Sequence, residues 1–193
     1  MNRQVVLVDE QDNELGLAEI YEAHQGKGLK HRALSVILYR KKDGVTEILL
    51  QKRAEAKPVF KLLWSNTCCT NLRPRDTYLP RAVSRLQEEM GIEIEEKDLH
   101  ILYRFSYESP DLVTEGWCEN EVDTVIVGEW DPPSYKTPDG RGGEVKVNPE
   151  EAADYRWTPW GELQRDINTS PRKYTPWFRQ IIRNTELQKE IYG

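Results

Sequence analysis

The chain has 193 residues, enough for one sizeable hydrophobic core, and its formal charge is −6 at pH 7. Its 38% hydrophobic residues and six tryptophans exclude a disordered chain, and its mean hydropathy of −0.73 excludes a membrane protein. The negative net charge argues against duplex nucleic acid as the main partner. We expect a cytoplasmic globular protein that binds neither nucleic acid nor a membrane, either a monomer or a homodimer.

The first half of the chain contains three predicted strands. Gln4–Val8 is a short apolar run that ends at a turn. His31–Arg40 and Thr46–Arg53 are rich in β-branched and apolar residues and are separated by an Asp-Gly turn dipeptide, so they predict a hairpin. Lys57–Thr70 contains scattered apolar residues without a regular period, and we expect it to be mostly loop.

The clearest helix is predicted at Leu79–Met90. Leu79, Val83 and Leu86 recur at three- and four-residue spacing, and Gly91 supplies the expected stop. The other predicted elements are strands at Ile92–Ile94, Leu99–Tyr107, Glu119–Glu129 and Tyr155–Thr158, and helices at Trp160–Asp166 and Pro176–Glu190.

The order of these elements predicts the fold class. Strands dominate the first part of the chain, and the helices do not alternate with them as repeated βαβ units would. The sequence therefore predicts an α+β sandwich in one domain covering residues 1–193. Residues 131–149 contain several prolines and glycines, and we expect an exposed loop insertion there.

Two pairs of residues are candidate metal ligands. His24 and His31 flank a loop that contains glycines, which allows two imidazoles to converge. Glu119 and Glu121 are two residues apart at the start of a predicted strand, so both carboxylates lie on one face. Together the four would form a mixed nitrogen and oxygen site suited to Zn, Mn, Mg or Fe. The sequence alone leaves open that both pairs are simply solvated.

The end of the predicted helix and the basic residues around it indicate phosphate chemistry. Glu88 and Glu89 lie in the last helical turn, where the helix dipole disfavours acidic side chains. Arg53 and Lys57 follow the predicted hairpin, and Arg85 lies one turn before the second glutamate. These cations, together with Mg²⁺, would suit a diphosphate.

Seven segments, in this order, resemble the type 1 isopentenyl-diphosphate isomerases, which share the Nudix fold. The segments are EIYEAHQGKGLKHRALSVILY, ILLQKRAEAK, WSNTCCTN, LQEEMGIEI, CENEVDTVIV, YRWTPWGEL and YTPWFRQII. The resemblance runs from about Val5 to Phe178 and implies a Nudix-type α/β/α sandwich with a mixed sheet. It also implies interconversion of isopentenyl diphosphate and dimethylallyl diphosphate, by adding a proton to one carbon and removing another from a neighbouring carbon.

The same resemblance implies a role for each candidate residue. Cys69 and Glu121 would act as acid and base across the substrate, Tyr107 would assist the glutamate, and the face of Trp177 would stabilise a carbocation. The implied metal and substrate ligands are His24, His31, Glu119 and Glu121 for one divalent metal (Zn²⁺ or Mn²⁺), Glu89 for a Mg²⁺ that chelates the diphosphate, and Arg53, Lys57 and Arg85 for the diphosphate itself.

Two positions depart from the family pattern. Asn71 stands where the family has a metal-binding histidine two residues after the cysteine, and an amide is a poorer ligand for Zn²⁺ than imidazole. We therefore expect Asn71 at the metal site and the second metal to be bound more weakly there. Ile20 stands where the family uses a lysine near the diphosphate.

Two alternative functions stay open at this stage. A Nudix hydrolase of a diphosphate-containing substrate would need Gly, Glu, Arg and Glu at the positions of Thr70, Asp76, Ser84 and Arg85, and the chain has none of these. The missing glutamate at position 85 disfavours hydrolysis, because its carboxylate would otherwise help to hold the hydrolytic metals. A non-catalytic homologue that binds a diphosphate is the other alternative, because Asn71 and Ile20 alter the family's binding site.

Overall fold

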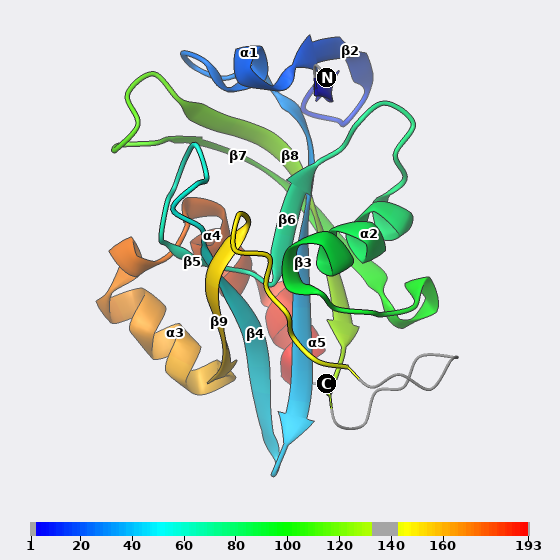
Figure 1. Cartoon of the computed structure of the whole chain (residues 1–193), viewed down its shortest axis with the longest axis vertical. Helices are drawn as coiled ribbons and strands as arrows, with labels where there is room; N and C mark the ends of the chain where they lie inside the picture. Colours follow the sequence, from blue (N-terminus) through cyan, green and yellow to red (C-terminus); the bar gives the residue numbers. More distant parts are fainter. Residues whose placement is uncertain (1–2, 133–142, 193) are drawn as a thin grey trace.

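A nine-stranded sheet and five α-helices form the part of the chain described in this computed structural model, residues 3–132 and 143–192 (Figure 1). The strands are β1 (Gln4–Val8), β2 (Glu14–Glu19), β3 (His31–Lys42), β4 (Val45–Arg53), β5 (Trp64–Ser65), β6 (Cys68–Asn71), β7 (His100–Pro110), β8 (Cys118–Glu129) and β9 (Ala152–Pro159). The helices are α1 (Ile20–His24), α2 (Tyr78–Met90), α3 (Trp160–Thr169), α4 (Pro176–Arg183) and α5 (Thr185–Tyr192), with 3₁₀ turns at Glu96–Asp98 and Pro171–Lys173.

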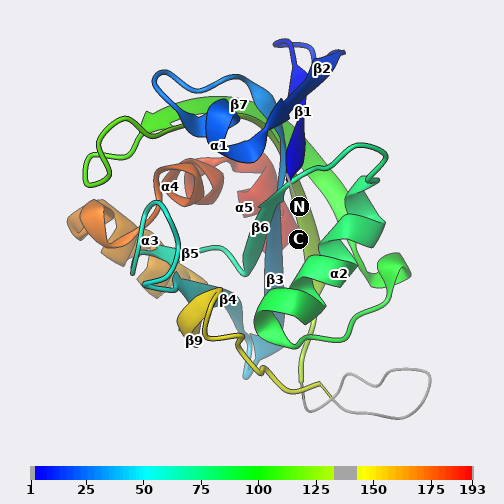
Figure 2. The same cartoon turned by 45° about the horizontal axis from the view of Figure 1, so that its top comes forward.

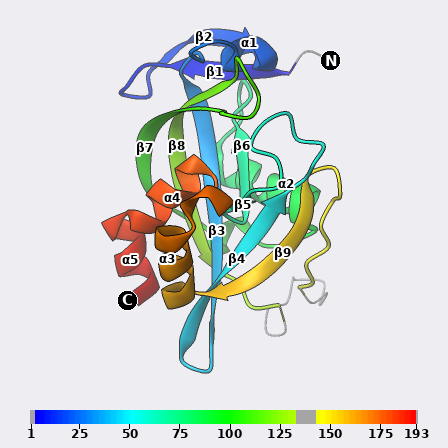
Figure 3. The ribbon, with the colours of Figure 1, turned by 90° about the vertical axis from the view of Figure 1, so that its left-hand side faces the viewer.

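Strand β3 is the centre of the sheet. It pairs in parallel with β8 and antiparallel with β4 and β6, so the sheet is mixed. Helix α2 lies on one face of β3, and α3, α4 and α5 lie on the other (Figures 2 and 3). This confirms the predicted α/β/α sandwich with a mixed sheet. Strands β1 and β2 and helix α1 lie together at one end of the sheet (Figure 3).

Alternation along β3 explains why both faces of the sheet are covered. Leu34, Val36 and Leu38 pack with the apolar side of α2, whereas Ile37 and Tyr39 pack with residues from α3, α4 and α5. Each of these side chains is less than a tenth exposed. A strand that buries both faces is held on two sides, so the residues at its start, where the site is formed, are placed firmly.

The hairpin is confirmed. Asp43 and Gly44 both have positive φ, 51° and 76°, which is the backbone that a two-residue type I′ turn between antiparallel strands requires. The strands at Gln4–Val8, Leu99–Tyr107, Glu119–Glu129 and Tyr155–Thr158 and the helices at Leu79–Met90 and Trp160–Asp166 are also confirmed, most of them longer than predicted.

Lys57–Thr70 is mostly loop, as predicted, but the short strand β5 and most of β6 form in its second half. The hydroxyl of Thr67 accepts from Leu38 N at 2.9 Å and donates to Leu49 O at 2.7 Å, and Asn66 Nδ2 donates to Cys68 O at 2.6 Å. Buried polar side chains that bond to the backbone thus hold this segment in the sheet. Such a segment has no apolar period to recognise.

Two further predictions need correction. Ile92–Ile94 is not a strand: Ile92 N donates to Leu86 O, which ends α2, and both isoleucine side chains are buried against the core below that helix. The helix predicted at Pro176–Glu190 is two helices, because Asn184 is extended and its Oδ1 accepts from Glu186 N to begin α5.

The predicted loop insertion at residues 131–149 falls partly on residues 133–142, which lie outside the described residues. After them, Val145 and Val147 pack against the core beneath α2, so this end of the insertion is partly buried. Whether the chain is one domain stays a prediction. None of the helices in the described ranges is long and apolar enough to cross a bilayer.

Gly91→Ala is expected to lower the free energy of unfolding by about 1–3 kcal/mol more than Gly44→Ala does. Gly91 ends α2 with φ 63°, and a Cβ there would lie 2.7 Å from Lys146 O. Gly44 is the matched control, because its φ is 76° but nothing lies within 4 Å of its added Cβ. Urea unfolding of both variants measures the difference, and equal losses would show that the contact at Gly91 is harmless.

Candidate active site

One cavity of about 550 Å³ collects most of the residues that the sequence singles out. It is lined by residues of β6, β7, β8, α1, α2 and α4, and by the loop that follows β4. Its volume suits a small organic ligand. The predicted residues in its wall are His24, Arg53, Lys57, Cys69, Asn71, Arg85, Tyr107, Glu119, Glu121 and Trp177.

Two histidines and two glutamates form a cluster at one side of this cavity. One ligand atom from each of His24, His31, Glu119 and Glu121 lies within 4.8 Å of the others, and all four residues are buried. The parallel register of β3 and β8 places His31 directly beside Glu121, while the period of two along β8 puts Glu119 on the same face. Helix α1 brings His24 to the cluster.

The hydrogen bonds of the two imidazoles leave the same nitrogen facing the cluster in each ring. The Nδ1 atoms of His24 and His31 lie 2.6 Å and 2.7 Å from backbone carbonyl oxygens, which accept from them. The Nε2 of His31 is buried without a hydrogen-bond partner, 3.4 Å from Glu121 Oε1. A backbone acceptor on Nδ1 and a free Nε2 is the arrangement of metal-binding histidines, so the residues present fit a divalent metal.

The charges in the cluster also favour a bound metal ion. Burial lowers the pKa of His24, but the hydrogen bond and the charge of Glu119, 3.0 Å from Nε2, outweigh burial and raise that pKa to about 9. Burial alone would raise the pKa of Glu119, whereas the hydrogen bond and charge of His24 lower it. The buried carboxylates thus require a positive charge beside them, which a metal ion can supply.

Glu121 also receives two hydrogen bonds from side chains of the cavity wall. The hydroxyl of Tyr107 donates to Oε2 at 2.6 Å, because β7 and β8 pair these two residues directly. The amide Nδ2 of Asn71 donates to Oε1 at 2.7 Å. The side chain of Asn71 therefore points into the site, and the carboxylate is fixed from two sides.

Cys69 faces the same cavity from β6. Its Sγ lies 3.8 Å from Nη1 of Arg53, whose other nitrogens donate to the carbonyl oxygens of the loop after β4. Burial raises the pKa of Cys69 to about 12, although the charge of Arg53 opposes this. The sulfur therefore keeps its proton at neutral pH, and the thiol can act as a proton donor.

Trp177 completes the wall with an aromatic face. Its ring centroid lies 5.2 Å from that of Phe60 and 6.0 Å from that of Tyr107, and its Nε1 donates to Asn66 Oδ1 at 3.0 Å. The guanidinium carbon of Arg53 lies 5.3 Å from the ring centroid of Trp177. A ring that is fixed in this way presents its negative face at a constant place, which suits a cationic or apolar group.

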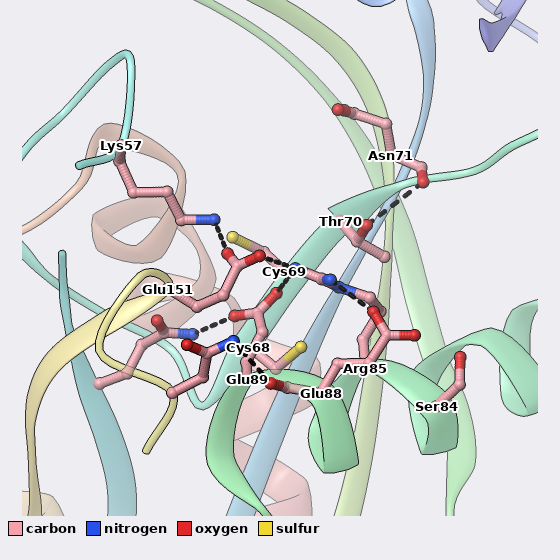
Figure 4. A network of polar contacts seen from close by, with 12 residues as sticks. Lys57, Cys68, Cys69, Thr70, Asn71, Ser84, Arg85, Glu88, Glu89 and Glu151 are labelled. Atoms are coloured by element: carbon pink, nitrogen blue, oxygen red, sulfur yellow. Dashed lines mark hydrogen bonds and ion pairs between the residues drawn. The ribbon is translucent and has the colours of Figure 1, made fainter. Parts of the chain in front are cut away.

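Two of the predicted diphosphate ligands, Lys57 and Arg85, lie close together at Glu151 and are engaged in ion pairs (Figure 4). Lys57 pairs with Glu151, and Arg85 pairs with Glu151 at 3.3 Å and with Glu88 at 2.6 Å. Glu151 was not among the residues predicted for the site. It lies beyond the insertion, in a segment without a motif, so no pattern marked it.

Glu89 is not part of the metal cluster. Its side chain is 1% exposed, and its oxygens accept from Arg85 and, at 2.9 Å, from Gln51 Nε2. A metal would have to displace one of these donors to reach it. The prediction that Glu89 binds Mg²⁺ therefore stays a prediction.

The comparisons with known proteins agree with this geometry. Residues 29–178 match the NUDIX domain family. Isopentenyl-diphosphate Delta-isomerase 1 of Aromatoleum aromaticum is 38% identical over 94% of this chain and 92% of its own length. The isopentenyl-diphosphate Delta-isomerase of Aliivibrio fischeri ATCC 700601 is 35% identical over 98% of this chain and 99% of its own. The chain belongs to the isopentenyl-diphosphate isomerase family of Nudix proteins.

Solved structures support the Nudix fold of this isomerase-family chain at greater distance. The Deinococcus radiodurans protein DR0079 superimposes with a TM-score of 0.69 at 15% identity, over 93% of this chain and 97% of that one. The NUDIX domain of Shewanella oneidensis NrtR has a TM-score of 0.54 at 17% identity, over 82% and 86% of the two chains. Both likenesses concern the fold alone.

Proposed function

We propose that this protein interconverts isopentenyl diphosphate and dimethylallyl diphosphate. The observation that carries the proposal is that Cys69 and Glu121, from different strands, line one cavity with Tyr107 and Trp177. A proton donor, a proton acceptor and an aromatic face are what the reaction needs. The names of the relatives, over nearly the full length of the chain, support the same activity.

The chemistry is two proton transfers without any change of oxidation state. One of the two groups gives a proton to the terminal alkene carbon, and the π electrons form the new C–H bond and leave a tertiary carbocation. The other group takes a proton from the methylene carbon on the other side of the cationic carbon, and the electrons of that C–H bond form the new double bond. Cys69 has a protonated thiol and Glu121 a carboxylate for these roles, while the Trp177 ring stabilises the cation.

We propose that His24, His31, Glu119 and Glu121 hold one divalent metal, for which the nitrogen and oxygen donors suit Zn²⁺ or Mn²⁺. When bound, the metal would supply positive charge that orients Glu121. A Mg²⁺ on the diphosphate, with Glu89 as a ligand, is the second proposed cofactor. Arg53, Lys57 and Arg85 would bind the diphosphate, and Lys57 and Arg85 would give up part of their present ion pairs to do so.

Asn71→His is expected to raise the affinity for Zn²⁺ by at least about tenfold, because imidazole is the better ligand for this metal. The side chain at position 71 already points at Glu121. Competition with a chelating dye measures the affinity without any turnover. Thr70→His is the control, since neighbouring residues of β6 face opposite sides of the strand. An equal gain in both variants, or none in Asn71→His, would contradict the placement of residue 71.

Incubation of the purified protein with isopentenyl diphosphate, followed by NMR, tests the proposed function directly. Dimethylallyl diphosphate should appear until the two isomers reach equilibrium. A panel of nucleoside diphosphates, with phosphate release as the readout, tests hydrolysis. Release of phosphate without isomerisation would make the protein a hydrolase, and no reaction with any of these compounds would make it a binding protein.

The structure gives a reason to expect isomerisation rather than hydrolysis. Arg85 occupies the position at which a Nudix hydrolase has a metal-binding glutamate, and its guanidinium pairs with both Glu88 and Glu89. A cation therefore stands where a hydrolytic metal would need a carboxylate.

A further inference from the structure

Two arginines in the wall of the cavity have no part in the site described above. Arg73 lies in the loop between β6 and α2, and Arg81 lies in the first turn of α2. Both line the same cavity as Cys69, at the end that α2 covers. Sequence patterns did not mark either of them, because neither belongs to a recognised motif.

Arg81 is buried but poorly partnered. It is 8% exposed, and its Nε is buried without a hydrogen bond. Its nearest contacts are all long: Thr70 Oγ1 at 3.4 Å, Asp76 Oδ2 at 3.4 Å and Glu88 Oε1 at 3.7 Å. A guanidinium carries five N–H donors, so most of its capacity is unused. A buried charge with so few hydrogen-bond partners destabilises the protein unless an anion binds to it.

The groups around Arg81 do not neutralise it. Burial lowers the pKa of Arg81, and the neighbouring guanidinium groups of Arg73 and Arg85 lower it further, against the opposing effects of Glu88 and Asp76. Glu88 is shared, since it also pairs with Arg85 at 2.6 Å. Arg73 is exposed, and within the described ranges its side chain forms no hydrogen bond or ion pair. Arg73 and Arg81 therefore keep N–H donors without a close acceptor at the α2 end of the cavity.

This end of the cavity is one residue along β6 from the proposed acid. Thr70, which contacts Arg81, follows Cys69 directly, and their side chains leave the strand on different sides (Figure 4). Among the described strands, β6 pairs with β3 alone, so its other edge is open toward the cavity. A ligand that reaches past this edge from Cys69 would meet the two arginines.

We infer that Arg73 and Arg81 form a phosphoryl subsite at the α2 end of the cavity, beyond Arg53, Lys57 and Arg85. The chemistry it recognises is a tetrahedral oxyanion with two or more negative charges, which guanidinium groups bind through paired N–H donors. The source is either the distal phosphoryl group of the diphosphate substrate or free inorganic phosphate. In the first case the inference rests on the proposed function and deepens it.

Calorimetric titration with pyrophosphate, at a fixed Mg²⁺ concentration, tests the subsite without any turnover. Arg81→Gln should raise the dissociation constant about tenfold, as expected for the loss of a charged hydrogen-bonding group, and Arg73→Gln should raise it in the same direction. Arg75→Gln is the matched control: it removes the same charge from the same loop, and Arg75 does not line the cavity. Because Arg73 is exposed, its variant is expected to fold even if Arg81→Gln does not.

A second titration with orthophosphate separates the two sources. If the subsite serves the substrate, only pyrophosphate loses affinity, and Arg73→Gln raises KM for isopentenyl diphosphate without lowering kcat. If it takes free phosphate, both ligands lose affinity. The inference is overturned if neither Arg73→Gln nor Arg81→Gln differs from Arg75→Gln, or if the wild type binds neither anion. A protein that binds pyrophosphate through these arginines but does not isomerise would contradict the proposed function and leave the phosphoryl subsite supported.

Discussion

Cys69→Ala and Glu121→Gln are each expected to lower kcat/KM for isopentenyl diphosphate by about a thousandfold. Each change removes one of the two groups that move protons, and neither alters the size or shape of the cavity much. Because the reaction needs one proton added and one removed, either loss alone stops turnover. The NMR assay of isomer exchange measures the effect, and thermal unfolding shows that the variants fold.

A matched control for this experiment comes from β8, the strand that carries Glu121. Cys118→Ala removes another buried thiol, and Cys118 does not line the cavity. Its activity should match that of the wild type. A Cys69→Ala variant that retains more than about a tenth of wild-type activity would not fit the proton transfers proposed, since acid–base groups contribute 10²–10⁴-fold or so.

His31→Gln is expected to lower the affinity for a transition metal, because it removes a metal ligand. Loss of a residue that only hydrogen-bonds to a metal ligand costs roughly 10–100-fold in affinity, and loss of the ligand itself should cost more. The Nε2 atom of His31 is buried, has no other partner and faces Glu121. The amide that replaces it offers only a weak oxygen donor. Metal analysis after dialysis, and the rise in Tm on adding Zn²⁺ or Mn²⁺, both report the loss.

His100→Gln is the control for that prediction, because His100 is the third histidine of the chain and its side chain is 55% exposed, outside the cluster. Equal metal content in His31→Gln and His100→Gln would show that the cluster is held by hydrogen bonds alone. In that case the histidines would serve only to position Glu119 and Glu121.

Local patterns in the sequence account for much of the fold. The hairpin was predictable because its turn dipeptide and its two strands are adjacent, and α2 because its apolar spacing and terminal glycine lie within one window. The segment at Cys68–Asn71 was not, because its place in the sheet depends on buried hydrogen bonds that link Asn66 and Thr67 to β3 and β4. Strand β2 and helix α1 are short and carry no clear period, so they were missed.

The candidate site was predictable in its residues but not in its arrangement. The resemblance to a family supplied the positions, and only the parallel pairing of β3 with β8 brings His31 beside Glu121. No local pattern specifies a contact between residues so far apart in the sequence. The same holds for Glu151 and for Arg81, whose importance comes from what they face in three dimensions.

The pairing of β8 with its neighbours has a consequence for how this protein can change. Its carboxylates at positions 119 and 121 share a side of the strand, while Asn120 and Val122 occupy the other. Inserting a single amino acid near the beginning of β8 would move these side chains to the opposite face of the strand. The two carboxylates would then enter the apolar interior, and His24 and His31 would lose contact with Glu119 and Glu121. A change of length within β8 is therefore much harder to accommodate than one in the loop ahead of it, residues 111–117.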